Sequence, residues 1–175
     1  MRLAAIAAAA SVVATSALAQ PLPAPASYPP VTGEKGVVTT HALSMEMADK
    51  IAHGAVDACR KMGFRTTITV LDSSGALKAF LRDDGTGPHT MEFARMKAYT
   101  ARTRNQTSLA TMKQMEDPAN AFLKQIPNVV GVGGGVPIRA GNEVIGGVGV
   151  SGAPGGEKDE VCANAGIAKV ADALK

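Results

Sequence analysis

The stretch TTITVLDSSGALKAFL, residues 66–81, decides the fold of this 175-residue chain. Residues 66–71 and 76–81 are mostly β-branched or apolar, which is typical of β-strands. Between them lies Asp72-Ser73-Ser74-Gly75, a run of turn-forming residues. The stretch therefore predicts a β-hairpin.

A second hairpin is predicted nearer the C-terminus. Its strands are expected over residues 129–136 and 143–150, with a turn at Ala140-Gly141-Asn142. Eleven of the 19 glycines lie between Gly131 and Gly156. Because glycine weakens strands, this concentration indicates close packing of the backbone against another element or a ligand.

Helical segments flank both hairpins. The first has Ser44 as its N-cap and Gly63 just past its end, and an apolar stripe formed by Leu43, Met47, Ile51, Ala55, Cys59 and Met62. Further helices are predicted over residues 90–103, from Asp117-Pro118 onward, and over 157–174. The predicted fold class is α/β (α+β): an antiparallel sheet of at least four strands with helices on both faces, in the order α-ββ-α(α)-ββ-α.

The N-terminal part of the chain has the composition of a targeting segment and a linker. Residues 1–19 combine Arg2, an apolar run and the cleavage pattern Ala17-Leu18-Ala19, as in a secretory signal peptide. The apolar run is shorter than the roughly 20 residues of a membrane-spanning helix. Residues 20–38 hold five of the ten prolines and predict a linker before a domain over 39–175. We expect a periplasmic or secreted protein with no membrane span in its mature chain.

The charge and aromatic content argue against nucleic acid as a partner. The formal charge is +3, and it falls to +2 without Arg2. Only six residues are aromatic. Nucleic-acid binding normally needs a strongly basic surface or exposed aromatic side chains on which bases stack.

Two cysteines lie on different predicted helices. Cys59 is near the end of the first helix and Cys162 is near the start of the last. If these helices pack antiparallel on one face of the sheet, the two thiols meet, and export would permit a disulfide. The alternative is a pair of small buried apolar residues.

The chain resembles the GlcG/HbpS haem-binding (haem-degrading) domain family. The resemblance rests on DGTGPHT (84–90) followed by Ala94, Lys97-Ala98 and Thr100-Ala101, and on GGGVPI (133–138), IGGVGVSG (145–152) and Asp159-Glu160. It covers about residues 43–174. It implies an antiparallel sheet between helices, self-association into a homo-oligomer, and haem or iron-porphyrin binding in some members. For other members it implies only a link to glycolate use.

His89 is the candidate metal ligand, since histidine commonly ligates haem iron. It follows the loop glycines Gly85 and Gly87, which are included as cofactor-binding candidates. The alternative is a solvent-facing residue beside a helix N-cap at Thr90. The other histidines, His41 and His53, are expected to be exposed surface residues.

Lys97 is the candidate cation for a propionate or another carboxylate. It lies eight residues after His89, so the two could share one face of a helix, and the resemblance favours it over Arg95. The alternative is a solvated basic face.

The last predicted strand ends in a glycine-rich run that suggests two kinds of binding site. The run from Gly147 to Gly152 fits G-x-G-x-x-G, but no strand follows it, so it is not a dinucleotide fingerprint. A glycine-rich turn before a helix can still present N–H groups to an anion, which makes Gly152 a binding candidate.

Three weaker signals have simpler explanations. Glu157, Asp159 and Glu160 complement a helix dipole, with a surface iron site as the alternative. Met45 and Met47, and likewise Met112 and Met115, are closely spaced, as copper-binding thioethers can be. Since Met47 and Met62 fall on the apolar stripe, packing is the better explanation of the methionines. Ser151 lacks the surrounding pattern of a hydrolase nucleophile.

The leading interpretation is an exported haem or iron-porphyrin binding protein rather than an enzyme. The alternatives are a haem-degrading enzyme, a protein that binds a small hydroxy-carboxylate such as glycolate, and an oligomeric accessory protein without a small ligand.

Overall fold

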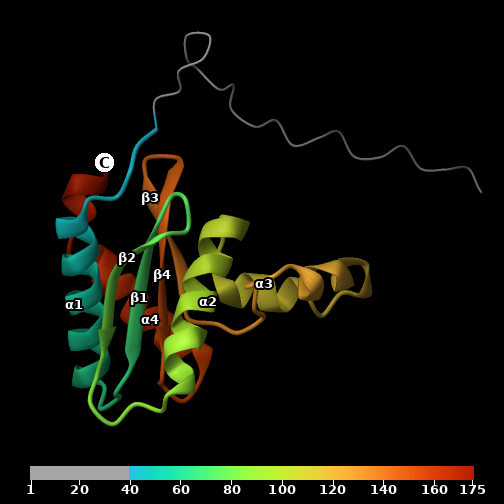
Figure 1. The fold of residues 1–175 in the computed structure, drawn as a ribbon, viewed down its shortest axis with the longest axis horizontal. Helices are drawn as coiled ribbons and strands as arrows, with labels where there is room; N and C mark the ends of the chain where they lie inside the picture. The colour runs from blue at the N-terminus through green and yellow to red at the C-terminus, as the bar shows by residue number, and fades with distance from the viewer. Residues whose placement is uncertain (1–39) are drawn as a thin grey trace, which may run out of the picture. The chain divides into compact units, whose positions relative to one another are not determined.

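A four-stranded antiparallel sheet forms the centre of the domain (Figure 1). The strands are β1 (Thr67–Asp72), β2 (Leu77–Arg82), β3 (Gly135–Ala140) and β4 (Glu143–Ser151), in the spatial order β2-β1-β4-β3. The structure, a computed structural model, describes residues 40–175, and the predicted signal peptide and linker lie outside the described residues.

Helices cover both faces of this sheet. Helices α1 (Met45–Lys61) and α4 (Gly156–Ala168) pack on one face, and α2 (His89–Arg104) packs across β1, β4 and β3 on the other (Figure 1). Three short helices complete the domain: α3 (Ser108–Gln114), η1 (Pro118–Gln125) and η2 (Ala171–Leu174). The predicted fold class and the order of the elements are confirmed.

The side chains that α1 buries explain its position. Leu43, Ile51, Ala55 and Cys59 of the predicted stripe are buried, and Ser44 caps the helix by accepting from the N–H of Met47 at 3.2 Å. Met62 was predicted to belong to this stripe but is exposed, because the helix ends there and the chain turns at Gly63.

The glycines of β4 allow α2 to lie unusually close to the sheet. A Cβ atom at Gly147 would collide with the carbonyl oxygen of Ala98, and one at Gly149 with that of Ala94. The close backbone packing predicted from the glycine content is therefore packing against a helix.

A disulfide joins α1 to α4. Cys59 and Cys162 are bonded, with 5.4 Å between their Cα atoms, and the two helices run antiparallel on one sheet face. The predicted pairing is confirmed. In the chain-entropy view, closing a loop of this length stabilises the fold by about 4–5 kcal/mol.

Several predicted boundaries were wrong. The first strand of the second hairpin was expected over 129–136 but is Gly135–Ala140, since Gly134 has φ +121° and the preceding segment packs on α2 and α3. The last helix ends at Ala168 instead of continuing to 174. Helix α3 was not predicted.

The segment expected to begin a helix at Asp117-Pro118 is a 3-10 helix, capped by the Asp117 carboxylate. None of the helices in residues 40–175 is long and apolar enough to cross a membrane.

Candidate functional site

The loop between β2 and α2, residues 83–88, is organised by the carboxylate of Asp83. The side chain of Asp83 is only 2% exposed and accepts two hydrogen bonds from Arg60, from Nε at 3.0 Å and Nη2 at 2.9 Å. It also accepts from the backbone N–H of Asp84 at 2.9 Å. Gly85 then turns the chain with φ +77°, a conformation that favours glycine. The loop is thereby fixed to the end of α1.

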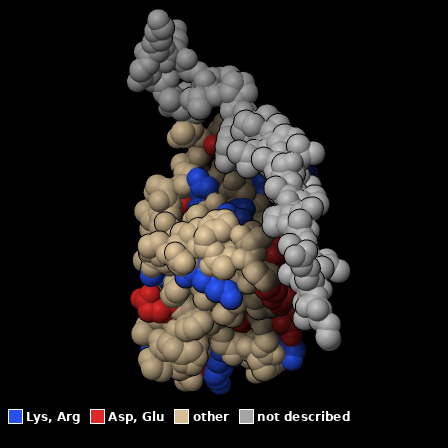
Figure 2. Space-filling view, turned by 90° about the vertical axis from the view of Figure 1, so that its right-hand side faces the viewer, with Lys and Arg blue, Asp and Glu red and all other residues tan. Residues whose placement is uncertain are grey.

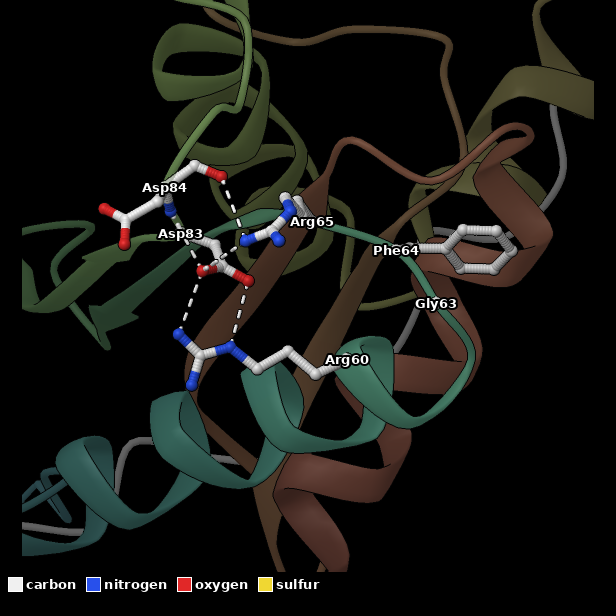
Figure 3. A pocket seen from close by; sticks show the side chains of 6 residues that line it. All are labelled: Arg60, Gly63, Phe64, Arg65, Asp83 and Asp84. Carbon is white, nitrogen blue, oxygen red and sulfur yellow. Dashed lines mark hydrogen bonds and ion pairs between the residues drawn. The ribbon is translucent and has the colours of Figure 1, made fainter.

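Beside this carboxylate lies an open cavity of about 380 Å³, which we call the arginine hollow. It is lined by Arg60 of α1, by the turn residues Gly63, Phe64 and Arg65, and by Asp83 and Asp84. Figure 3 shows the two guanidinium groups on either side of the Asp83 carboxylate, with the Asp84 carboxylate directed away from them. Arg65 is held loosely, with Nη1 3.9 Å from Asp83 Oδ1 and 3.5 Å from the carbonyl oxygen of Asp84.

The electrostatics keep this group of residues ionised. Hydrogen bonding from Arg60 is the largest influence on Asp83 and lowers the pKa of its carboxyl group below the usual range. The same bond raises the pKa of Arg60. At neutral pH two guanidinium groups therefore flank the ionised carboxylate of Asp83.

His89 begins α2 immediately after the loop. Its ring is exposed and meets the Phe93 ring edge to face, with 6.2 Å between the centroids. The imidazole lies close to Gly87, since a Cβ atom there would be 2.8 Å from Cε1 of the ring and the ring would have to move aside. Gly85, Gly87 and His89, predicted as site residues, thus lie on one short segment.

The three histidines differ in what they bind within the protein. His41 is 2.6 Å from the Glu143 carboxylate, and His53 is 3.1 Å from the carbonyl oxygen of Asp49. No group in residues 40–175 forms a hydrogen bond with the ring nitrogens of His89. Its imidazole is therefore available to a ligand or a metal.

The helix start near Thr90 was predicted incorrectly. Thr90 was expected to be the N-cap of α2, but Pro88 occupies that position and Thr90 is buried in the first turn. Its hydroxyl group donates to the carbonyl oxygen of Gly87 at 2.7 Å and lies 2.7 Å from the hydroxyl of Thr67. The residue connects α2 to β1.

Lys97 lies apart from His89, in the interior. Its side chain is 3% exposed, and Nζ donates to Asp159 Oδ2 at 2.8 Å and to the carbonyl oxygen of Val150 at 3.0 Å. Asp159 is equally buried and also accepts from the N–H of Ala153 at 3.0 Å. Burial is the largest influence on Asp159 and raises the pKa of its carboxyl group, against the opposing effect of Lys97. The binding role of Lys97 stays a prediction.

Gly152 packs against the backbone of the turn that carries Arg65. It has φ +137°, and a Cβ atom there would lie 2.5 Å from the carbonyl oxygen of Arg65. The loop after β4 can approach the turn that carries Arg65 only because this residue is glycine.

The acidic residues at the start of α4 do not form a surface iron site. Asp159 is bound to Lys97, and Glu160 accepts from the N–H of Leu109 at 3.1 Å. In the described part of the chain, no group of three or more histidine, cysteine, aspartate or glutamate residues is placed to hold a metal ion. That alternative was wrong.

A small second core explains part of the methionine content. Met115 is buried with Leu123 and Val129, and Tyr99 and Ile126 pack against them. Met115 and Met112 also line a second hollow, of about 390 Å³. Packing is thus the structural role of Met115.

The residues of the arginine hollow were missed by sequence reasoning. Arg60 and Arg65 are two of 18 basic residues, and no spacing relates them to Asp83, which is 23 positions beyond Arg60. The available signal was weak: a basic residue in the last turn of a helix, and two acidic residues opening a glycine-containing loop.

Figure 2 shows that basic and acidic side chains are intermixed on the described part of the face in view.

Comparison with known proteins identifies the domain. Residues 43–168 match the family described as haem degrading protein HbpS-like. The chain belongs to the HbpS-like family. The family predicted from the sequence is thereby confirmed.

Individual relatives of this HbpS-like chain agree with that assignment. Protein GlcG of Escherichia coli strain K12 is 30% identical over 109 residues, which are 62% of this chain and 81% of GlcG. A double mutant of HbpS from Streptomyces reticuli has a crystal structure that is 35% identical in sequence, with a TM-score of 0.74 over 82% of this chain and 97% of that chain.

A more distant likeness concerns the fold alone. The crystal structure of the PduOC:heme complex is 23% identical to this HbpS-like chain, with a TM-score of 0.66 over 74% of this chain and 95% of that one.

Proposed function

We propose that this chain is an exported protein that binds haem or another iron porphyrin, with His89 as the iron ligand. The observation that carries the proposal is the His89 imidazole, which is exposed, free of hydrogen bonds within residues 40–175, and backed by an aromatic ring. Membership of the HbpS-like family and the likeness to a protein crystallised with heme support the choice of ligand.

The residues around His89 fit a porphyrin bound at the surface. An imidazole nitrogen is a common axial ligand of haem iron. Phe93 and Met91, both 37% exposed, offer apolar contacts to a macrocycle on the first turns of α2. The arginine hollow and the hollow at Met115 are open and are not lined by His89. A porphyrin at His89 would therefore need cover from a second copy of the chain, in line with the expected homo-oligomer.

Export is supported by the disulfide as well as by the predicted signal peptide. Disulfides persist in oxidising compartments and are rare in the cytosol. The Cys59–Cys162 bond joins two helices in the hydrophobic core, where it stabilises the fold. A periplasmic or secreted location suits both features.

Titration with haemin tests the proposal. For the wild-type protein we expect a shifted Soret band and saturable binding. His89→Ala should lower the affinity about tenfold or more and change the band, because the iron loses its protein ligand. His53→Ala, which removes another exposed histidine, is the matched control and should behave as wild type. Unchanged affinity and an unchanged spectrum in His89→Ala would reject the ligand role.

The family description makes haem degradation the second candidate function. Adding a reductant and oxygen to the same haemin-loaded sample distinguishes haem binding from haem degradation. Binding alone predicts a stable Soret band. Loss of that band with the appearance of biliverdin-like absorption, when catalase is present to remove free hydrogen peroxide, would support haem degradation by the protein.

A further inference from the structure

The arginine hollow contains more hydrogen-bond donors than the protein uses. Arg60 gives Nε and Nη2 to Asp83, and within residues 40–175 its Nη1 has no partner. Arg65 makes two long contacts through Nη1, to the carbonyl oxygen of Asp84 and to Asp83 Oδ1, and its Nε and Nη2 have no partner in the same range. The side chain of Arg60 is 56% exposed and that of Arg65 is 65% exposed. Both guanidinium groups can therefore reach a ligand from solvent.

Asp83 prepares these donors for an anion. Its buried carboxylate fixes Arg60 by a two-point bond and attracts Arg65 from the other side (Figure 3). The Arg60 guanidinium group is already oriented by this bond and therefore loses less freedom on binding an anion. Since both oxygens of Asp83 accept from Arg60, Asp83 leaves the Nε and Nη2 donors of Arg65 free.

Other charged residues also lie near the hollow. The carboxylate of Asp84 points away from both guanidinium groups, and Asp84 and Asp57 both act on Arg60 through space only. A third cation, Lys158 of α4, lies over the Phe64 ring, 5.4 Å from its centroid. The cavity volume of about 380 Å³ is at the small end of the range for ligand pockets.

We infer that the arginine hollow binds a carboxylate group, with the Nε and Nη2 donors of Arg65 as the principal contact and Nη1 of Arg60 as the second. Arginine and carboxylate form paired, charge-assisted hydrogen bonds, which are stronger than neutral ones. The carboxylate is either a propionate of a porphyrin or a free small acid, and the site stands whether or not the chain binds haem.

The experiment measures the binding of two kinds of ligand, small acids and haemins, to the wild type, Arg65→Gln and Arg65→Lys. Glycolate, oxalate and propionate are titrated separately while backbone amide shifts are followed by NMR. Haemin and haemin dimethyl ester, which lacks free propionates, are titrated by absorbance. Arg95→Gln is the matched control, because it removes the same charge from an exposed arginine that binds Glu92 and Asn128 instead.

Arg65→Gln should weaken binding of the carboxylate ligand about tenfold or more, given the strength of hydrogen bonds to charged groups. Arg65→Lys keeps the positive charge but not the paired donors of the guanidinium group, and it should show an intermediate loss of affinity. A loss seen with haemin but not with its ester assigns the carboxylate to the porphyrin. A loss seen with a free acid, with shifts at residues 63–65 and 83–85, assigns it to a small acid.

The inference is overturned if Arg65→Gln, folded as judged by its amide spectrum, binds every probe as Arg95→Gln does. It is also overturned if no probe shifts the amides of residues 63–65 and 83–85 in the wild type. Wild-type protein that binds a free acid but not haemin would reject haem binding while supporting the carboxylate site.

Discussion

Two ion pairs with buried aspartates serve different purposes in this domain. The side chains of Asp83 and Asp159 are both 2% exposed. The cation of the Lys97–Asp159 pair is 3% exposed, whereas Arg60 and Arg65 beside Asp83 are more than half exposed. We call Lys97–Asp159 the sealed pair, because its ammonium group donates to acceptors within the protein. We call Arg60, Arg65 and Asp83 the open group, because its guanidinium groups keep donors free for a ligand. Binding capacity therefore depends on which donors remain free, not on the presence of a buried salt bridge.

Close backbone packing creates the sealed pair. A Cβ atom at Gly134 would lie 2.8 Å from Cβ of Asp159 and 3.0 Å from Cδ of Lys97. Gly135 touches the backbone of Lys97 in the same way. The two side chains are almost inaccessible to solvent. The pair links α2 to β4 and to α4, and the two helices lie on opposite faces of the sheet.

The largest predicted effect comes from breaking the sealed pair. Lys97→Met should lower the free energy of unfolding by about 3–5 kcal/mol, because it leaves the Asp159 carboxylate buried without its cation. Urea denaturation with the disulfide intact measures the change.

Two further variants sharpen this prediction. Lys97→Met combined with Asp159→Leu should recover much of the lost stability, since no unpaired charge remains. Lys113→Met, at an exposed lysine, should differ little from wild type. A loss below about 1 kcal/mol in Lys97→Met would contradict the sealed character of the pair.

Breaking the open group should have a smaller effect that depends on pH. Arg60→Gln removes the main partner of Asp83 but leaves Arg65 and the N–H of Asp84. Arg60 lowers the pKa of Asp83 in the folded state, so its contribution to stability is present above the unfolded value of about 3.9 and is lost as the pH falls through the folded value.

Urea denaturation at neutral pH and at about pH 3 measures this dependence. The stability difference between wild type and Arg60→Gln should be largest at neutral pH and should narrow on acidification. The raised pKa of Asp159 acts in the opposite direction but is common to both proteins. Lys61→Gln, in the same helical turn, controls for net charge. A difference that widened in acid would contradict the assignment.

Local sequence patterns predicted the parts of the fold that depend on neighbouring residues. The turn at residues 72–75 and the Ser44 cap follow from short-range chemistry and periodicity. The disulfide between Cys59 and Cys162, which are 103 positions apart, was predicted only on the condition that their helices pack antiparallel. The start of β3 at Gly135 was not predicted, because it depends on the packing of Gly134 against Asp159 and Lys97.

The site residues show the same division. His89 and its loop glycines were predicted as candidates because they lie together in sequence, and their binding role stays a prediction. Arg60 and Arg65 were not predicted, because their proximity to Asp83 arises only when α1 packs beside the β2–α2 loop. The sequence identified Lys97 as a cation but did not reveal that its charge is buried against Asp159.

Hydrogen–deuterium exchange with and without haemin tests the contrast between the open and sealed regions most directly. We predict that haemin slows exchange at residues 83–93, with a further effect at 60–65 if a propionate enters the arginine hollow. Residues 150–159, around the sealed pair, should be unchanged. Protection concentrated at 150–159, with none at 83–93, would contradict this account.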